Sequence, residues 1–259
     1  MPKCLTESYT SIKYDFIRPG ETLASLSCGD LHILQKKDGY RFSLDAYLLS
    51  AFVEEKPGTA VVEIGSGSGV VAVLLAGMKR LRITGVEVQA DLAEISQRTV
   101  ALNELADWVD IVPGDIRDYA GKRVTAVITN PPYRPMHAGR LNPVKAKAIA
   151  RHEVLLDLET LLASAYAILH KGGRFYCIYP AWRMADLFSS LREHKIEPKR
   201  MVMVHSTLTQ RAELILVMAV KDGGRELKAG PPFSVYGPDG AYSRDMEKVF
   251  SQLKMPKSH

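Results

Sequence analysis

From Ala60 onward, the sequence alternates short apolar runs with stretches of helical periodicity. The apolar runs that read as strands cover residues 60–65, 83–88, 109–114, 124–129, 174–180, 199–206 and 213–221. Helical patterns fall between them at residues 69–79, 90–105, 154–170 and 181–195. This alternation is typical of an α/β fold with a doubly wound, mostly parallel sheet. Too few residues join the last two strands for a helical crossover, so the predicted seven-stranded sheet ends with an antiparallel strand.

The chain is predicted to have one main domain, residues 56–222, with a segment on either side. Residues 1–55 read as a small N-terminal extension with short strands at 22–27 and 31–36 and a helix that Ser43 caps. Residues 223–259 are rich in Gly and Pro and read as a C-terminal tail. Trp108 and Trp182 are interpreted as packing residues rather than platforms for bases.

Composition restricts the class of protein. With 46% hydrophobic residues in 259, the chain can form a sizeable core. It has no apolar run long enough to span a membrane and no signal-peptide pattern, so we expect a soluble, cytoplasmic protein with no membrane partner. Cys4, Cys28 and Cys177 lie far apart, and His137, His152 and His205 lack metal-ligand spacing. Neither a disulfide framework nor a metal site is indicated.

A glycine-rich turn follows the first strand of the main domain. Gly65, Gly67 and Gly69 in "EIGSGSG" stand where this strand ends and a helix begins. Ligands of open parallel sheets bind at the carboxyl ends of strands, and glycines let the backbone approach them closely. Because "GSGVVA" also fits a dinucleotide fingerprint, with Glu87 placed 20 residues after Gly67, a nicotinamide enzyme is one alternative.

Three acids favour another cofactor. Glu63 precedes the first glycine by two residues, and the pattern E-x-G-x-G-x-G resembles the first motif of class I methyltransferases, which use S-adenosyl-L-methionine and release S-adenosyl-L-homocysteine. The resemblance implies that Glu87 binds the ribose hydroxyls and that Asp115, in "PGDIRD", contacts the adenine. It extends the cofactor site to neighbours of these motifs: Ser66, Val88, Ile116 and Asn130.

The strand at 124–129 runs into Asn130, Pro131, Pro132 and Tyr133. An exocyclic amine or an amide is a poor nucleophile because its lone pair is delocalised. Asn130 Oδ1 and the Pro131 carbonyl can accept its two N–H hydrogens and direct the lone pair at a methyl donor. Two prolines stiffen the segment, and Tyr133 can stack on a planar target. This N-P-P-Y set resembles the amino-methyltransferases, in which no catalytic metal is needed.

Several segments together resemble the bacterial tRNA1(Val) (adenine-37-N6)-methyltransferase family. They are "GYRFSLDAYLLSAF" (39–52), "EIGSGSG", "NPPY" and "ARHE" (150–153). The resemblance implies methylation of adenine N6 in tRNA. It also places Phe42, Ser43 and Asp45 near the methionine end of the cofactor.

A basic run independently favours RNA as the substrate. Between residues 134 and 152 the sequence has no acid and these cations: Arg134, Arg140, Lys145, Lys147 and Arg151. Such a run can hold phosphates on either side of an extruded nucleotide. Methylation of a protein glutamine or of an rRNA base, and RNA binding without catalysis, stay as alternatives. The sequence sets no oligomeric state.

Overall fold

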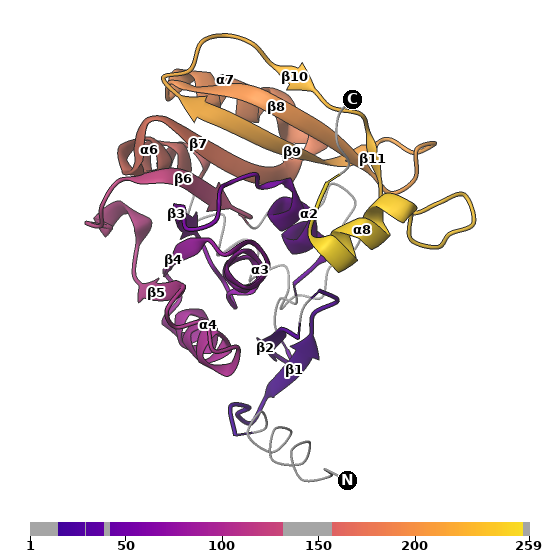
Figure 1. The fold of residues 1–259 in the computed structure, drawn as a ribbon. Coiled ribbons are helices and arrows are strands. Elements are labelled where there is room, and N and C mark those ends of the chain that lie inside the picture. The colour runs from indigo at the N-terminus through magenta and orange to yellow at the C-terminus, as the bar shows by residue number, and fades with distance from the viewer. Residues whose placement is uncertain (1–14, 29, 39–41, 132–156, 256–259) are drawn as a thin grey trace.

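The structure is a computed structural model and describes residues 15–28, 30–38, 42–131 and 157–255. A large central sheet crosses the molecule (Figure 1). Its long strands are β3 (Ala60–Ile64), β4 (Arg82–Glu87), β5 (Val109–Pro113), β6 (Val124–Thr129), β7 (Leu169–Pro180), β8 (Ile196–His205) and β9 (Ala212–Lys221). They lie in the order β5-β4-β3-β6-β7-β9-β8. The neighbours from β5 to β7 pair in parallel, and β9 pairs antiparallel to both β7 and β8. The predicted seven-stranded sheet with an antiparallel last strand is confirmed.

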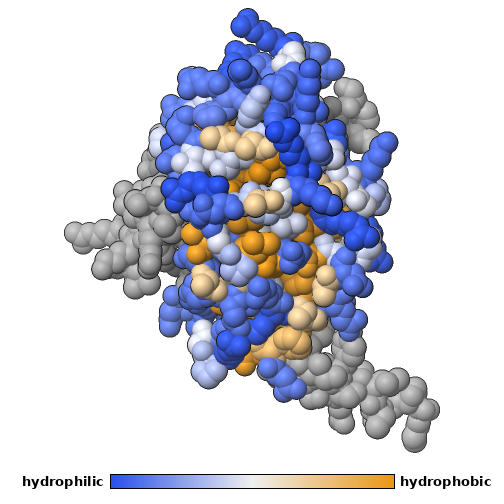
Figure 2. Space-filling model, turned by 90° about the vertical axis from the view of Figure 1, so that its left-hand side faces the viewer, coloured by the Kyte–Doolittle hydropathy of each residue, from blue (hydrophilic) through white to orange (hydrophobic). Residues whose placement is uncertain are grey.

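Helices cover both faces of the sheet, which explains the unbroken apolar character of its central strands. In β3, every residue after Ala60 is buried. One face packs against α2 (Leu44–Phe52), α3 (Val70–Lys79), α4 (Ala90–Leu102) and α8 (Arg244–Gln252). The other packs against the short turn η1 (Ile116–Asp118), α6 (Leu158–Ile168) and α7 (Met184–Glu193). Figure 2 shows the side of the molecule at the left of Figure 1, where apolar side chains gather in the middle among hydrophilic ones.

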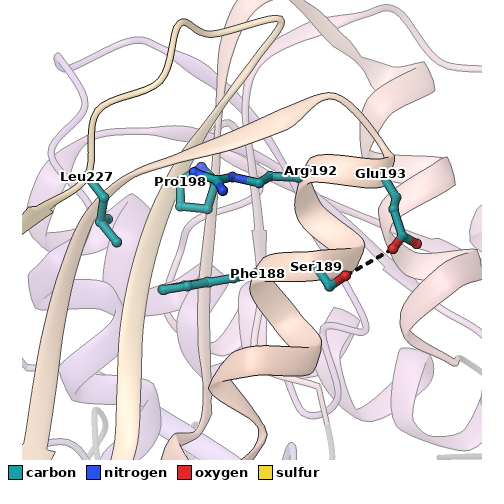
Figure 3. Close-up of a pocket in the computed structure, with 6 residues that line it drawn as sticks. All are labelled: Phe188, Ser189, Arg192, Glu193, Pro198 and Leu227. Atoms are coloured by element: carbon teal, nitrogen blue, oxygen red, sulfur yellow. Dashed lines mark hydrogen bonds between the residues drawn. The ribbon is translucent and has the colours of Figure 1, made fainter.

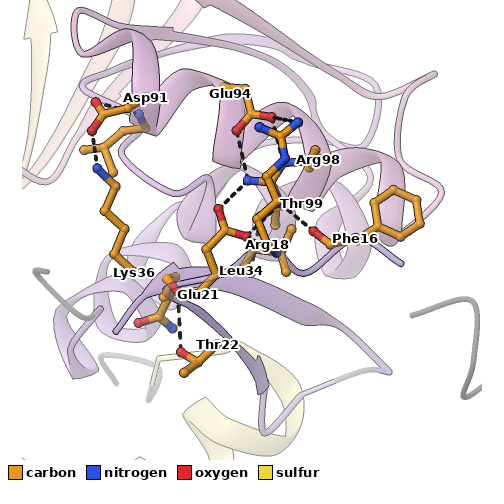
Figure 4. A network of polar contacts seen from close by, with 12 residues as sticks. Phe16, Arg18, Glu21, Thr22, Leu34, Lys36, Asp91, Glu94, Arg98 and Thr99 are labelled. Carbon is orange, nitrogen blue, oxygen red and sulfur yellow. Dashed lines mark hydrogen bonds and ion pairs between the residues drawn. The ribbon is translucent and has the colours of Figure 1, made fainter. Parts of the chain in front are cut away.

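The N-terminal hairpin packs on α4. Its strands, β1 (Glu21–Ser25) and β2 (His32–Lys36), pair antiparallel. Arg98 of α4 donates to both carboxyl oxygens of Glu21, at 2.5 and 2.8 Å, and Leu34 N donates to Thr99 Oγ1 at 3.3 Å (Figure 4). Lys36 forms an ion pair with Asp91 at the start of the same helix. The predicted extension thus contacts a helix that follows the glycine-rich turn.

The C-terminal segment contains elements that the sequence analysis did not predict. Strands β10 (Lys228–Ala229) and β11 (Phe233–Ser234) pair in parallel with β8, which makes the sheet nine-stranded. Ser243 caps α8 by accepting from Met246 N. Met246, Val249 and Leu253 are fully buried in the core. The residues read as a tail therefore complete one face of the molecule.

Element ends differ most between α6 and β7. The predicted helix at 154–170 overlaps α6, which ends at Ile168, and residues 154–156 lie outside the described residues. Strand β7 begins at Leu169, five residues before the predicted start at 174. The sequence "HKGG" reads as a turn, but β7 continues through these residues. It does so with Gly172 at a φ of 75° and with a shift in the pairing of β6 with β7. No helix in the described part of the chain is long and apolar enough to cross a bilayer.

Candidate methyl-transfer site

The glycine-rich turn connects β3 to α3 at the carboxyl edge of the parallel strands. Gly65 N and Ser66 N donate to Val86 O of the neighbouring strand β4, at 2.9 and 3.3 Å. Gly65, Gly67 and Gly69 all have positive φ angles, of 74°, 56° and 84°. A side chain at Gly65 or Gly67 would meet no atom within 4 Å. The turn therefore presents open backbone at the edge where this class of sheet binds its ligands.

Gly69 is required for a second reason. A Cβ at this position would lie 2.4 Å from Ser96 Oγ of α4. Ser96 Oγ is buried and has no hydrogen-bond partner among the described residues. Because Gly69 begins α3, the absence of a side chain lets α3 and α4 approach each other beside the turn. Sequence reasoning identified Gly69 but missed Ser96, which no local motif marks.

Glu87, at the end of β4, ties the turn to the next strand. Its Oε2 accepts from Gly67 N at 2.8 Å, and its Oε1 accepts from Gln89 N and Gln89 Nε2 at 3.0 and 3.3 Å. Only 3% of Glu87 is exposed. The acid predicted to bind ribose hydroxyls is thus in direct contact with the predicted cofactor loop. Gln89, which sequence reasoning missed, fixes the orientation of this carboxyl group.

Glu63 is the most unusual ionisable group of the site. It is 2% exposed, and its Oε2 has no hydrogen-bond partner among the described residues. Burial and, secondarily, the nearby Glu87 carboxyl group raise the pKa of Glu63 well above its ordinary value, although the Ala72 N–H partly offsets this shift. A buried acid with an unused oxygen is costly for stability. Perturbed acids of this kind concentrate at functional sites.

Three predicted cofactor-binding residues, Val88, Asp115 and Ile116, lie just after β4 and β5. Val88 is 41% exposed, a large fraction for an apolar side chain, whereas Ile116 is buried. Asp115 caps η1 by accepting from Arg117 N, and Arg117 Nη2 donates to its Oδ2 at 2.6 Å. The hydrogen bonds from Arg117 hold the pKa of Asp115 below its ordinary value. The capping role of Asp115 leaves its position at the carboxyl edge unchanged.

The helix α2 brings a further predicted segment toward the turn. Ser43 caps α2 by accepting from Asp45 N, as the sequence predicts. At the other end of α2, Lys79 Nζ, from the last turn of α3, donates to Ala51 O at 3.1 Å. The helices α2 and α3 thus pack together, with their carboxyl ends in contact. Phe42 precedes this cap, and its ring lies 6.2 Å from that of Tyr47.

Asn130 and Pro131 follow β6 at the same edge. Strand β6 pairs with β3 so that Thr129 lies beside Ile64, and Thr129 Oγ1 donates to Ile64 O at 3.0 Å. Asn130 therefore comes directly next to Gly65. Pro131 is buried and Asn130 is partly exposed. Pro132, Tyr133 and the five predicted RNA-binding cations, Arg134, Arg140, Lys145, Lys147 and Arg151, lie outside the described residues.

The described residues hold no group of three or more His, Cys, Asp or Glu side chains that could bind a metal ion. A surface hollow of about 340 Å³ lies elsewhere, against α7 and the start of β8 (Figure 3). Its lining residues are Phe188, Ser189, Arg192, Glu193, Pro198 and Leu227. Since β8 runs parallel to β3, the start of β8 lies at the amino edge of the sheet, opposite the glycine-rich turn. The hollow is separate from the candidate site.

Comparisons with known proteins place this arrangement in a family. The chain is 29% identical over 189 residues to a Porphyromonas gingivalis protein named tRNA1(Val) (adenine(37)-N6)-methyltransferase, over 68% of this chain and 72% of the relative. A Dickeya chrysanthemi protein of the same name is 28% identical over 190 residues, which cover 71% of this chain and 74% of that one.

The fold has close structural neighbours. The crystal structure of protein Atu636 from Agrobacterium tumefaciens, described as a predicted O-methyltransferase, superposes with a TM-score of 0.65 at 18% identity. The superposition covers 82% of this chain and 98% of that one. A family model described as the methyltransferase small domain matches residues 44–193, from the start of α2 to the end of α7. This match spans more than half of the chain, so the protein is a methyl-transferring enzyme and belongs to the methyltransferase small domain family.

Proposed function

We propose that the protein transfers a methyl group from S-adenosyl-L-methionine to the N6 amino group of adenine in tRNA, at adenosine 37 of valine tRNA. The observation that carries this proposal is the position of Asn130 and Pro131 at the end of β6, beside the Gly65 turn of β3. The relatives from P. gingivalis and D. chrysanthemi, whose printed names state this activity, support it.

The residues at the turn fit the proposed cofactor. The open backbone at Gly65 and Gly67 leaves room for a ligand, and the carboxyl group of Glu87 stands beside it. Val88 offers exposed apolar surface to a base. The unused oxygen of Glu63 adds a buried acid to a site for a ligand that carries positive charge. When bound, S-adenosyl-L-methionine supplies an electrophilic methyl group on its sulfonium.

Asn130 and Pro131 act on the methyl acceptor. Asn130 Oδ1 and the Pro131 carbonyl accept the two N–H hydrogens of the adenine amine, which aligns its lone pair for attack. Pro131 has no N–H, and the bond that Thr129 Oγ1 donates to Ile64 O fixes the strand just before these acceptors. Orientation of this kind needs no strong base, because the methylated amine loses its proton readily to water.

The sequence that follows supports RNA as the carrier of the amine. Tyr133 can stack on the target base, and the run from Arg134 to Arg151 supplies cations for phosphates. We also propose that the protein acts in the cytoplasm, because tRNA is modified there in bacteria. Asn130 Oδ1 and the Pro131 carbonyl could equally accept the N–H hydrogens of a glutamine amide, so the identity of the methylated group has to be tested directly.

Incubation with labelled S-adenosyl-L-methionine and unmodified total tRNA, followed by digestion to nucleosides, tests the proposal. We expect the label in N6-methyladenosine. A release factor that carries glutamine in its target loop is offered in a parallel reaction. Label in methylglutamine, with none in tRNA, would reject adenine as the acceptor and leave the methyl-transfer site itself intact.

A further inference from the structure

Trp182 is an exposed aromatic residue just beyond the end of a strand. It lies in the short turn η2 (Ala181–Arg183), directly after β7, and is 50% exposed. It is absent from the residues that pack against either core cluster. Trp108, in contrast, packs against the core, and the guanidinium groups of Arg80 and Arg82 both lie near its ring. The prediction that both tryptophans are packing residues is therefore wrong for Trp182.

The register of the sheet places Trp182 next to the candidate site. Strand β7 pairs in parallel with β6, and Cys177 lies beside Thr129. Asn130 is thus level with Ile178, and Trp182 follows four residues later, beyond the carboxyl end of β7. With strands about 4.8 Å apart and a rise of about 3.3 Å per residue, Trp182 lies about 10–15 Å from Asn130. A few nucleotides of a single strand span that distance.

Arg183 gives this aromatic side chain a cationic neighbour. Its guanidinium carbon lies 5.8 Å from the ring centre of Trp182 and 5.3 Å from that of the buried Tyr179. Arg183 Nε also faces Asp186 Oδ2 at 3.6 Å, a long contact to a side chain that is mostly exposed. The guanidinium is therefore held in place by two rings and is only weakly neutralised.

We propose that Trp182 and Arg183 form a docking point for a nucleotide that neighbours the target adenosine. Trp182 stacks on the base and Arg183 contacts the adjoining phosphate. This inference rests on the proposed function, because the docking point would bind the tRNA nucleotides next to the target adenosine. An exposed aromatic ring beside a cation is the combination by which proteins hold single-stranded nucleic acid without reading its sequence.

The two tryptophans allow a matched test. Trp182→Leu and Trp108→Leu each remove one ring and keep apolar bulk. We expect Trp182→Leu to raise KM for tRNA roughly 5- to 150-fold with kcat nearly unchanged, the range expected for loss of one base stack. Trp108→Leu, at the opposite edge of the sheet, should leave KM unchanged. An unchanged KM in Trp182→Leu, while the wild type methylates tRNA, would overturn the docking point and leave the proposed function standing.

Fluorescence gives a readout that a purely structural role would not produce. Since the chain has two tryptophans, Trp108→Leu leaves Trp182 as the sole tryptophan, which can be excited selectively. Addition of an unmodified tRNA anticodon stem-loop should quench it, and Asp186→Asn, which frees Arg183, should lower the midpoint of quenching. Quenching by a release factor but not by the stem-loop, or a midpoint that Asp186→Asn leaves unchanged, would reject the proposal. Failure of the wild type to methylate tRNA would instead reject the function on which it rests.

Discussion

The two edges of the central sheet handle buried polar groups differently. At the carboxyl edge, Glu63 Oε2 and Ser66 Oγ are buried without hydrogen-bond partners among the described residues. At the amino edge, Lys79 donates to Ala51 O at the end of α2, and Lys221 donates to Leu169 O at the end of α6. Side chains there satisfy helix carbonyls that would otherwise lack partners.

The backbone shows the same contrast. The glycine-rich turn at the carboxyl edge has three alternate glycines with positive φ, and Trp182 and Val88 are exposed there. At the amino edge, the side chain of Glu55 is 1% exposed and accepts from Arg174 Nη2 at 2.5 Å and from Tyr176 Oη at 3.0 Å. The carboxyl edge thus combines left-handed glycines with a buried acid that keeps an unpaired oxygen, features that suit a ligand site, whereas the Glu55 cluster at the amino edge stabilises the fold.

The largest effect should come from Asn130→Ala. Loss of one positioned acceptor should lower kcat about 10²- to 10³-fold, as for other preorganised polar groups, with tRNA affinity retained. Steady-state methylation of tRNA measures this. Asn103→Ala is the matched control, because Asn103 Nδ2 donates to His32 O on the N-terminal hairpin. That variant should lose stability only. Equal loss of kcat in both would contradict a special role for Asn130.

Glu55→Ala tests the amino edge. It leaves Arg174 and Tyr176 without their shared carboxyl group, so the free energy of unfolding should fall by about 2–3 kcal/mol, below the range for a fully buried pair because Arg174 is partly exposed. The neighbouring Glu54, 64% exposed and 2.6 Å from Arg200 Nη1, is the control. Glu54→Ala should cost under about 1 kcal/mol in urea unfolding. A larger loss of stability in Glu54→Ala than in Glu55→Ala would contradict the stabilising role of the amino edge.

Gly69→Ala tests the packing beneath the turn. The substitution combines a left-handed φ with a contact to Ser96 Oγ, so we expect a loss of about 2 kcal/mol. Gly240 has a similar φ of 80° but no atom within 4 Å of an added Cβ, and Gly240→Ala isolates the backbone cost, about 1 kcal/mol. Thermal or urea unfolding compares the two. Equal losses would mean that α3 and α4 do not need the close approach.

Glu63→Gln should have the smallest effect and the opposite sign. Because the folded-state pKa of Glu63 is raised, the unfolded chain loses this proton first as pH increases above about 4.5. The free energy of unfolding of the wild type therefore falls with pH up to the folded-state pKa. Glutamine removes this slope, so the variant should be more stable than the wild type at about pH 8 and nearly equal to it at about pH 4.

Urea unfolding at several pH values measures this difference. The exposed Glu213→Gln is the control and should keep the pH dependence of the wild type. If Glu63 contacts the cofactor as proposed, calorimetry should show weaker binding of S-adenosyl-L-methionine by Glu63→Gln. If Glu63→Gln is more stable but binds the cofactor as tightly as the wild type, Glu63 is not part of the cofactor site.

The sheet could be predicted from sequence because buried parallel strands leave long apolar runs. The strands β3 and β6 are examples, and the short connection between β8 and β9 correctly indicated an antiparallel hairpin. The Ser43 cap was equally local. The C-terminal helix α8 was missed because Gly and Pro dominate the residues before it. Its signal was present in the spacing of Met246, Val249 and Leu253 after Ser243.

The site was predictable where motifs are contiguous and not where it depends on packing. "EIGSGSG" pointed to the turn, although it left a nicotinamide enzyme open until the methyltransferase family was identified. Ser96 reaches the turn through tertiary packing against Gly69, and Gln89 acts through its neighbour Glu87, whose contact with Gly67 joins two strands. Trp182 was misread because residue type alone does not show which edge of a sheet a side chain reaches.

The most direct test of the proposed function is to map the methylated nucleotide in valine tRNA. Unmodified tRNA1(Val) is incubated with the enzyme and S-adenosyl-L-methionine, cut to oligonucleotides and analysed by mass spectrometry. We expect the wild type to add one methyl group, on N6 of adenosine 37, and Asn130→Ala to add none. Methylation of another nucleotide, or an unmodified tRNA alongside a methylated glutamine in a release factor, would contradict it.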